Sequence, residues 1–270
     1  MLNNHLWCIM DNNIKNRYNV IAHIAKGSYG YVNSALDKQT YTTVAIKEIN
    51  KNILQDMDTR VKEEIKIMSY ISHPNICKFI DWHEDENNYY IIMELIDGKD
   101  LFYILESTIL SVYDAKKYFI DICHAVKYLH ENKIVHRDIK IENILITTDR
   151  AVVCDMGFSE FQLDGELLTK RCGSLHMVPP ELLNNKNNKF DGYPCDIWAL
   201  GIVLYIMLSG KRPFNNTNIQ YLTDEFIRYK IYSAKMPYEA KHFISYILKV
   251  DPKERPTIKQ ILEHKWISDL

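Results

Sequence analysis

The sequence predicts an α+β fold with two lobes, in which a small β-rich N-terminal lobe contains one key helix and a larger C-terminal lobe is mostly helical. β-branched and aromatic runs dominate residues 18–94, whereas apolar residues recur at helical spacing after residue 98. With 270 residues, and about 150 per domain, the chain suits one large domain or two small ones. We therefore predict two lobes that join near residues 95–98, with a cleft between them.

The predicted organisation follows from where these patterns begin and end. Residues 1–17 hold little hydrophobic periodicity and many Asn, so we interpret them as a short N-terminal extension. The N-terminal lobe spans 18–94, a hinge spans 95–98 and the C-terminal lobe spans 99–267, which leaves 268–270 as the C-terminal end.

In the N-terminal lobe, the sequence predicts several strands and one helix. The β-rich runs predict strands at 18–24, 31–36, 43–49, near 76–82 and at 89–94. Residues 57–72 switch to helical spacing. Pro74 ends this helix because proline disfavours the helical conformation at the residue before it.

In the C-terminal lobe, apolar residues at helical spacing and capping residues predict several helices. A start that resembles a capping box at Ser111 precedes a long helix with one apolar face. The run 197–208 is apolar all round and predicts a buried helix that stops at Gly210. Helical patterns resume near 238–250 and 257–265.

Charge and composition exclude several classes of protein. Lys and Arg total 33 against 35 Asp and Glu, and the formal net charge of −2 supplies no basic field for binding nucleic acid. Hydrophobic residues make up 47% and charged residues 25%, values that are ordinary for a globular chain and exclude overall disorder.

Cysteine spacing and apolar run length indicate the compartment. Six cysteines lie far apart with no C-x-x-C pair, which favours neither a zinc site nor a disulfide framework and suits a reducing compartment. The longest apolar run, 197–208, is shorter than the roughly 20 residues that a membrane span needs. Residues 1–13 lack the pattern of a secretory signal. We therefore expect a cytoplasmic or nuclear protein with no membrane association.

Two patterns in the N-terminal lobe suit the binding of phosphate. The loop Ala25-Lys26-Gly27-Ser28-Tyr29-Gly30 lies between two strands, and its glycines let backbone N–H groups approach phosphate oxygens, although a plain hairpin turn would show the same residues. Lys47 ends an apolar strand, and Glu64 on the next helix is a partner for it. A solvated lysine and a surface carboxylate beside Lys62 and Lys66 are the alternatives.

Two patterns in the C-terminal lobe suit proton transfer and metal binding. Residues 136–143 read His-Arg-Asp-Ile-Lys-Ile-Glu-Asn between short apolar strands, where Asp138 suits a proton acceptor and Asn143 suits a ligand to a hard cation. Asp155-Met156-Gly157 follows another apolar run, where a carboxylate on a sharp turn suits a metal, and an Asx turn is the alternative.

Together these patterns occur once each, in the order found in eukaryotic-type serine/threonine protein kinases, and residues 18–267 resemble that family. Three later motifs agree with the resemblance. Pro179-Pro180-Glu181 resembles A-P-E, residues 196–201 resemble D-x-W-x-x-G, and residues 251–257 resemble the final-helix Arg motif. The family implies the bilobal protein-kinase fold and an ion pair between Glu181 and Arg255.

The resemblance implies an enzyme that uses ATP and Mg²⁺ to phosphorylate protein hydroxyls. It implies that Asp138 accepts the hydroxyl proton, that Lys140 stabilises the transferring phosphate, and that Lys47 holds the α- and β-phosphates. The residues implied to bind Mg²⁺ are Asn143 and Asp155. The residues implied to contact the nucleotide are Ile24, Ala25, Lys26, Gly27, Ser28, Tyr29, Gly30, Tyr31, Val32, Ala45, Lys47, Glu64, Met93, Glu94, Leu95, Asp100 and Leu145.

The resemblance also implies a class of substrate. Lys140, two residues after Asp138, is the serine/threonine-type signature, so the implied partners are proteins with Ser or Thr acceptors. Glu142 resembles the acidic residue that several families use to favour Arg upstream of the phosphorylated residue. We expect a monomer that binds neither nucleic acid nor membrane.

Three positions depart from the family pattern. Ala25 replaces the first glycine of the loop, Met156 replaces the usual Phe, and Pro179 replaces the usual Ala. A positive φ at Ala25 would cost about 1–2 kcal/mol and weaken ATP binding. Ala25 and Met156 keep one alternative open, a pseudokinase that serves as a binding or scaffold module. A kinase of small molecules is a third alternative, which the full activation segment and the expected pair of Glu181 and Arg255 count against.

Residues 155–181 correspond to the activation segment. Many kinases carry a phosphorylated Thr two residues before the Cys-Gly pair, which Arg137 then binds, but here that position is Lys170, next to Thr169. The stretch 167–183 resembles the checkpoint kinase one family, in the calcium/calmodulin-dependent kinase group. That likeness implies a segment ordered without phosphorylation and a cell-cycle or DNA-damage checkpoint role. Because the chain ends soon after the last motif, we expect regulation by a partner, by expression level or not at all.

Overall fold

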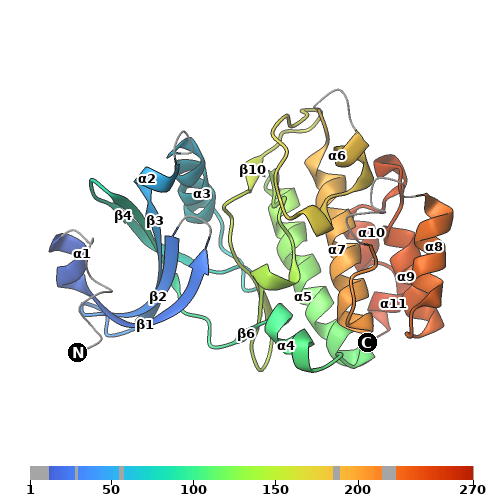
Figure 1. Ribbon diagram of the computed structural model, residues 1–270, viewed down its shortest axis with the longest axis horizontal. Helices are drawn as coiled ribbons and strands as arrows, with labels where there is room; N and C mark the ends of the chain where they lie inside the picture. Colours follow the sequence, from blue (N-terminus) through green and yellow to red (C-terminus); the bar gives the residue numbers. More distant parts are fainter. Residues whose placement is uncertain (1–11, 28–29, 55–57, 185–188, 215–222, 270) are drawn as a thin grey trace. The chain divides into compact units, whose positions relative to one another are not determined.

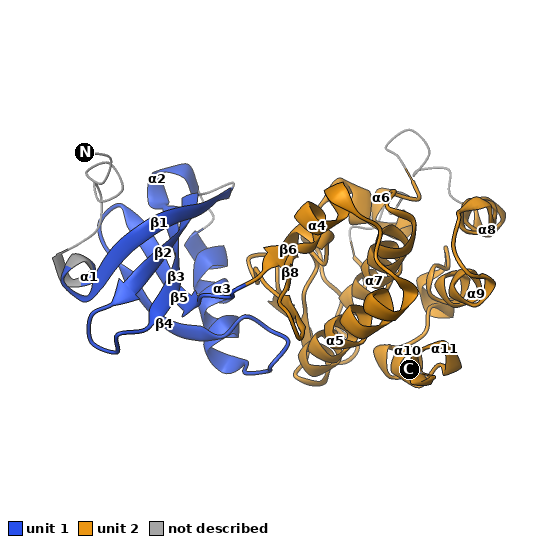
Figure 2. Cartoon of the chain, turned by 90° about the horizontal axis from the view of Figure 1, so that it is seen from below, with its two compact units in different colours: residues 1–97 blue, residues 98–270 orange. Residues whose placement is uncertain are grey.

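The computed structural model describes residues 12–27, 30–54, 58–184, 189–214 and 223–269 (Figure 1). The chain divides into two compact units, Met1–Asp97 and Gly98–Leu270 (Figure 2). Unit 1 is built on an antiparallel sheet, and unit 2 is built mainly on helices. The predicted α+β class, with a β-rich first lobe and a helical second lobe, is therefore confirmed.

Unit 1 contains one five-stranded antiparallel sheet in the order β1-β2-β3-β5-β4. Its strands are β1 Tyr18–Gly27, β2 Gly30–Asp37, β3 Thr43–Asn50, β4 Phe79–Glu84 and β5 Asn88–Glu94. The predicted strands are confirmed, and the largest shifts of boundary are at β1 and β4. β1 continues to Gly27, and β4 begins at Phe79 because residues 74–75 form a turn that the bond from Ile76 N–H to the His73 carbonyl closes at 3.0 Å.

Unit 1 also contains three helices in the part of the chain that the structure describes. They are α1 Asn12–Arg17, α2 Lys51–Leu54 and α3 Asp58–Tyr70, and α3 confirms the predicted helix to within two residues at its C-terminal end. α1 is not predicted by the sequence, because six residues show too little periodicity. It is held by tertiary contacts, since Ile14 is buried with Tyr18 and Val20 in the sheet core and Arg17 pairs with two strand carboxylates.

Unit 2 is organised around α7, Gly192–Ser209, which packs against α5, Val112–Glu131, and α9, Tyr238–Ile247 (Figure 1). Ser111 caps α5 by accepting the Asp114 N–H at 3.0 Å, and Gly210 ends α7 at φ +67°, as the sequence predicts. The remaining helices are α4 Leu101–Ser107, α6 Pro180–Asn184, α8 Asp224–Ser233, α10 Ile258–Leu262 and α11 Lys265–Ser268.

The sequence does not predict α4 and α8, whose signals are local. The Asp100 side chain caps α4 by accepting the Tyr103 N–H at 2.6 Å, and Thr223 caps α8 by accepting the Phe226 N–H at 3.2 Å. A single capping residue without a long apolar period is too weak to identify a helix from sequence.

Among the helices that the structure describes, α7 is the one long and apolar enough to cross a membrane by length and composition alone. Inside the protein, 83% of that segment is buried, and a core helix passes the same test. α7 is therefore the central core helix of unit 2, as its all-round apolar pattern predicts.

Short strands and one-turn helices frame the loops of unit 2. β6 Lys99–Asp100, β8 Ile144–Ile146 and β9 Ala151–Val153 form a sheet in the order β6-β8-β9, and β7 Ile134–Val135 pairs with β10 Glu160–Phe161. The 3₁₀ helices are η1 Ile141–Asn143, η2 Leu175–Met177 and η4 Pro252–Glu254. The apolar flanks of the His-Arg-Asp loop are thus strands, as predicted.

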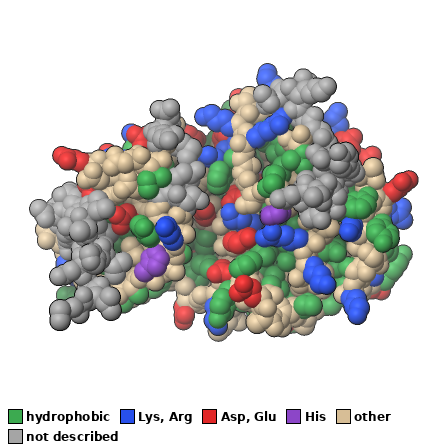
Figure 3. All heavy atoms as spheres, viewed as in Figure 1, with side chains coloured by type: hydrophobic (Ala, Val, Ile, Leu, Met, Phe, Trp, Pro, Cys, Tyr) green, Lys and Arg blue, Asp and Glu red, His purple; other side chains and the backbone are tan. Residues whose placement is uncertain are grey.

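Charge is mixed on the surface of the described residues. On the face shown in Figure 3, acidic and basic side chains are interspersed, and no single-sign field covers unit 2 there. This distribution agrees with the near balance of 33 basic and 35 acidic residues in the sequence.

The two glycines of the β1–β2 hairpin differ in how much space surrounds them. A Cβ added at Gly30 would lie 1.7 Å from the Glu48 carbonyl oxygen on β3, whereas at Gly27 the nearest atom would be 3.8 Å away. We predict that Gly30→Ala lowers the free energy of unfolding by about 2 kcal/mol, because β2 and β3 must separate. The matched Gly27→Ala should change it by less than about 0.5 kcal/mol. Urea unfolding of both variants checks this, and equal stabilities would contradict it.

Candidate active site

Lys47 and Glu64 form a close ion pair in unit 1. Lys47 lies on β3, and its Nζ is 2.6 Å from Oε1 of Glu64 on α3. The Glu64 side chain is only 4% exposed, so it is not a surface carboxylate. A buried carboxylate requires a cationic partner, and Lys47 is that partner for Glu64. The same contact holds the Lys47 ammonium in one place.

The other predicted nucleotide residues of unit 1 that the structure describes lie on four adjacent strands, β1, β2, β3 and β5, or directly after β5. The register sets Val32 opposite Lys47, and Ala45 opposite Met93. Ile24 to Gly27 end β1 and Gly30 to Val32 begin β2, whereas Ser28 and Tyr29 lie outside the described residues.

The backbone at the end of β5, where the predicted nucleotide residues Glu94 and Leu95 lie, already makes contacts within unit 1. The Glu94 N–H already donates to the Lys78 carbonyl at 2.9 Å, and Oε1 of Glu94 accepts the Lys78 N–H at 2.8 Å. Leu95, which follows directly, is half-buried. The backbone N–H of Glu94 is therefore committed within unit 1.

Ala25 carries no backbone strain. Among the described residues, the non-glycine residues with positive φ are Tyr41, Lys133, Arg137 and Asp155. Ala25 instead lies in β1, paired with Val32. The expected cost of alanine at this loop position is therefore absent, and this departure from the family pattern does not count against nucleotide binding.

In unit 2, the carboxylate of Asp196 on α7 fixes the backbone of the His-Arg-Asp loop, residues 136–143, which we call the catalytic loop. The N–H groups of His136 and Arg137 donate to its two oxygens at 2.8 Å each, and His130 Nε2 lies 3.0 Å from Oδ2. Burial by itself raises the pKa of Asp196, but the hydrogen bond from His130, the nearby His charges and the His136 N–H lower it, and the net direction is down. The anchored loop tolerates φ +66° at Arg137.

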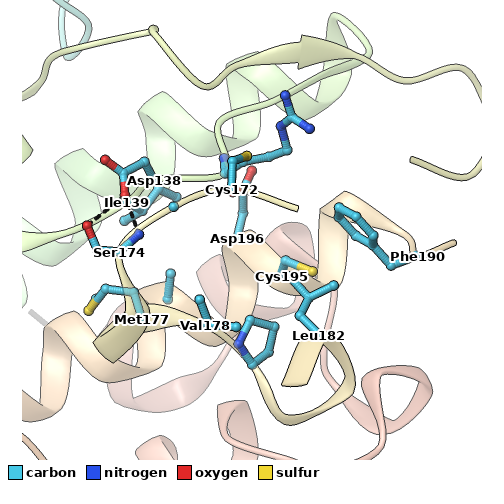
Figure 4. A pocket seen from close by; sticks show the side chains of 14 residues that line it. Asp138, Ile139, Cys172, Ser174, Met177, Val178, Leu182, Phe190, Cys195 and Asp196 are labelled. Carbon is cyan, nitrogen blue, oxygen red and sulfur yellow. Dashed lines mark hydrogen bonds between the residues drawn. The ribbon is translucent and has the colours of Figure 1, made fainter. Parts of the chain in front are cut away.

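The Asp138 carboxylate is held from both sides. Oδ1 accepts the Ser174 N–H at 2.9 Å and the Ser174 hydroxyl at 3.0 Å, as Figure 4 shows. Oδ2 accepts Lys140 Nζ at 2.6 Å and Asn143 Nδ2 at 3.1 Å. A buried carboxylate with this many donors is held in one orientation, which suits a proton acceptor.

Ser174, which contacts Asp138, is not among the site residues predicted from the sequence. It lies 36 residues from Asp138, in the segment that follows Gly173. Gly173 has φ +94°, and a Cβ there would lie 2.5 Å from the Arg137 carbonyl oxygen. This close approach brings Ser174 to Asp138, and the only sequence signal for it is the Cys-Gly pair.

Asn143 lies directly before β8, and Asp155 lies two residues after β9. The two residues therefore lie at adjacent ends of two paired strands. Ile144 on β8 pairs with Val153 on β9, and the Cys154 N–H donates to the Asn143 carbonyl at 2.8 Å. Asp155 has φ +64°, and its Oδ1 accepts the Gly157 N–H at 3.3 Å, so the predicted turn and the predicted carboxylate position coexist.

This donor set fits Mg²⁺ in a particular way. The described residues contain no group of three or more His, Cys, Asp or Glu that could hold a metal on its own. Mg²⁺ takes oxygen ligands and is commonly bound by one or two protein groups together with substrate phosphates. One carboxylate and one amide oxygen at neighbouring strand ends fit a divalent ion whose other ligands come from a nucleotide.

Asp100 and Leu145, two further predicted nucleotide residues, lie opposite each other in the β6–β8 pair. Asp100 also caps α4. Its carboxylate is therefore fixed by the start of a helix.

Behind the catalytic loop, Glu181 and Arg255 form the expected ion pair. The two guanidinium nitrogens donate to the two carboxylate oxygens at 2.8 and 2.6 Å. Asp138 also lines a small pocket, whose wall includes Val178 and Leu182 (Figure 4).

Comparison with known proteins identifies the class. The family model described as "Protein kinase domain" matches residues 18–267, so the chain belongs to the protein kinase family. It is 37% identical over 254 residues to a probable serine/threonine-protein kinase KIN1 homolog of Enterocytozoon bieneusi, with 93% of this chain and 42% of that protein covered.

Two further relatives are also kinases by name. The chain is 33% identical over 260 residues to the human NUAK family SNF1-like kinase 2, covering 95% of this chain and 41% of that protein. It is 36% identical over 253 residues to the Plasmodium falciparum calcium-dependent protein kinase 5, covering 90% and 44%. The chain thus spans about two fifths of the length of these curated relatives.

We predict that Asp196→Asn lowers the free energy of unfolding by about 3 kcal/mol at pH 7, because two buried N–H groups lose a charged acceptor. The contribution of a carboxylate with a lowered folded pKa is fully present above its unfolded pKa of about 3.9 and is lost as pH falls further. The difference from wild type should therefore be constant from pH 7 to 5 and shrink near pH 3. Urea unfolding at these pH values checks this, and a difference that grows at pH 3 would contradict it.

Proposed function

We propose that this chain is an active protein kinase domain that transfers the γ-phosphoryl group of Mg-ATP to Ser or Thr hydroxyls of proteins. The observation that carries the proposal is the Asp138 carboxylate, which Lys140, Asn143 and Ser174 orient together. The alternative of a pseudokinase is not favoured, because a module that only binds has no need for this arrangement.

Asp138 is the proposed acceptor of the hydroxyl proton. Four donors already reach its carboxylate, and a carboxylate offers about four lone-pair sites, so the incoming hydroxyl replaces one donor. Lys140 is the best suited to leave, because its Nζ also contacts the Ser174 hydroxyl at 3.1 Å. Once displaced, the Lys140 ammonium is available to the transferring phosphate.

The remaining polar residues are proposed to bind and orient. Mg-ATP, when bound, supplies the phosphoryl group and the divalent charge that neutralises it. Asn143 and Asp155 offer oxygen ligands to the ion, and Lys47, kept in place by Glu64, binds the α- and β-phosphates. The predicted nucleotide residues of each unit are proposed to bind the rest of the nucleotide.

Glu142 is proposed to favour substrates with Arg upstream of the acceptor. Its Oε1 lies 3.6 Å from Nη2 of Arg212, and both side chains are exposed. A substrate guanidinium would therefore compete with Arg212 for the same carboxylate.

The finer assignment to a checkpoint-type kinase is supported by residues 167–183 and is proposed with it. With this assignment we also propose that the activation segment, residues 155–181, is ordered without phosphorylation. We also propose a monomer that acts in the cytoplasm or nucleus, where the six widely spaced cysteines would stay reduced.

We predict that Asp138→Ala lowers kcat for a Ser/Thr peptide by about 100-fold or more, because the proton acceptor is lost. The measurement is phosphate transfer from Mg-ATP by recombinant protein, with Thr and Tyr versions of each peptide as the acceptor control. Wild-type protein that binds Mg-ATP in a thermal-shift assay but transfers no phosphate to any peptide would contradict the proposal and indicate a pseudokinase.

For substrate choice, we predict that Glu142→Gln reduces the preference for Arg-containing over Ala-containing peptides by about 2- to 5-fold, the range of an exposed ion pair. Arg212→Ala should raise the same preference, because it removes the internal competitor. A peptide array with wild type and both variants checks this. Identical preferences in all three would exclude Glu142 as the selecting residue.

A further inference from the structure

The guanidinium of Arg137, next to Asp138, is buried and carries a charge that needs compensation. Its side chain is 7% exposed. Nε donates to the Phe158 carbonyl at 2.6 Å, and Nη1 donates to the Lys170 carbonyl at 3.2 Å. Carbonyl groups satisfy hydrogen bonds but do not cancel a full positive charge in a poorly solvated site.

The compensating charge comes from Glu160. Its Oε2 lies 2.7 Å from Nη1 of Arg137. Backbone pairing fixes this position, since Glu160 on β10 is registered against Val135 on β7, just before the catalytic loop. Glu160 belongs to none of the motifs, which explains why the sequence analysis does not identify it.

The rest of the activation segment is also tied by contacts within unit 2. Gln162 is buried, and its amide donates to the Glu166 carbonyl at 3.0 Å and to Asp191 at 2.9 Å while accepting the Gly192 N–H at 2.9 Å. Further along, Leu168 and Phe190 exchange backbone hydrogen bonds of 2.8 and 3.0 Å. The described part of the segment is thus joined to the start of α7 by backbone and amide bonds.

We infer that Glu160 is a positioning residue whose carboxylate takes, at Arg137, the place of an activation-segment phosphate. This inference rests on the proposed kinase function and deepens it. Arg137 links the segment to the catalytic loop, because its backbone N–H is bound to Asp196 and its side chain to residues 158–170. With the charge of Arg137 already compensated, the loop and Ser174 keep their geometry, and catalysis is independent of phosphorylation within residues 155–181.

The test uses the whole chain, treated with phosphatase and checked by mass spectrometry for absence of phosphate. Glu160→Gln removes the charge but keeps the shape, and Glu160→Asp keeps the charge on a shorter side chain. Asp164→Asn is the matched control, because Asp164 pairs with Lys133 at 2.7 Å but is 79% exposed. For each protein, kcat, the KM for ATP and hydrogen–deuterium exchange of residues 158–172 are measured.

We predict that Glu160→Gln lowers kcat by about 10-fold or more, the scale of losing one partner of a buried charge pair, and leaves the KM for ATP within about twofold. Exchange in residues 158–172 should become faster. Glu160→Asp should retain more activity than Glu160→Gln, and Asp164→Asn should stay within about twofold of wild type in kcat.

A double variant guards against simple misfolding. Arg137→Gln combined with Glu160→Gln removes both charges, so its segment should exchange more slowly than that of Glu160→Gln alone if charge compensation is the role of Glu160. Faster exchange in the double variant would instead indicate a packing role and overturn the inference.

Two outcomes separate this inference from the proposed function. Activity that appears only after phosphorylation within 155–181 would overturn the inference while leaving the kinase function intact. Absence of phosphate transfer in every form would overturn the proposed function, and the exchange comparison would still decide on Glu160. Wild-type kcat and wild-type exchange in Glu160→Gln would overturn the inference directly.

Discussion

The rest of the candidate site depends on one buried carboxylate, that of Asp196. It accepts the backbone N–H groups of His136 and Arg137 from a helix that is itself buried, so the acceptor cannot move away from the loop. This anchoring compensates for the left-handed backbone at Arg137, a conformation that costs about 1–3 kcal/mol for a residue other than glycine. The position of Asp138, the next residue, follows from the fixed geometry of its neighbour.

From this anchor outward, three pairs of opposite charges order the site. Lys140 faces Asp138, Arg137 faces Glu160, and Arg255 faces Glu181, all within unit 2. Such pairs gain little net stability, because removing charges from water costs several kcal/mol per ion. Their value lies in geometry, since each partner holds the charged group of the other in one place. The residues proposed for catalysis are therefore oriented by the fold before any ligand binds.

How much of this could be predicted depends on how local each signal is. The strands of unit 1, the capped start at Ser111 and the apolar run of α7 are visible in short windows, because period and capping are properties of neighbouring residues. The catalytic motifs are equally local. Ser174 and Glu160 are different, because their roles arise from contacts with residues 36 and 23 positions away. The helix α1 is not predicted for the same reason, since Ile14 is buried by contacts with strands that only the folded sheet brings near it.

In the proposed function, the chain is a kinase whose active geometry needs no phosphate on residues 155–181. The most direct measurement is a progress curve of peptide phosphorylation, started with verified unphosphorylated protein and sampled in parallel for phosphate incorporated into residues 155–181. The account predicts product formation at full slope from the first time point, with no lag and with a slope that stays constant if phosphate accumulates on the segment. A lag whose end coincides with phosphate incorporation into that segment would contradict it.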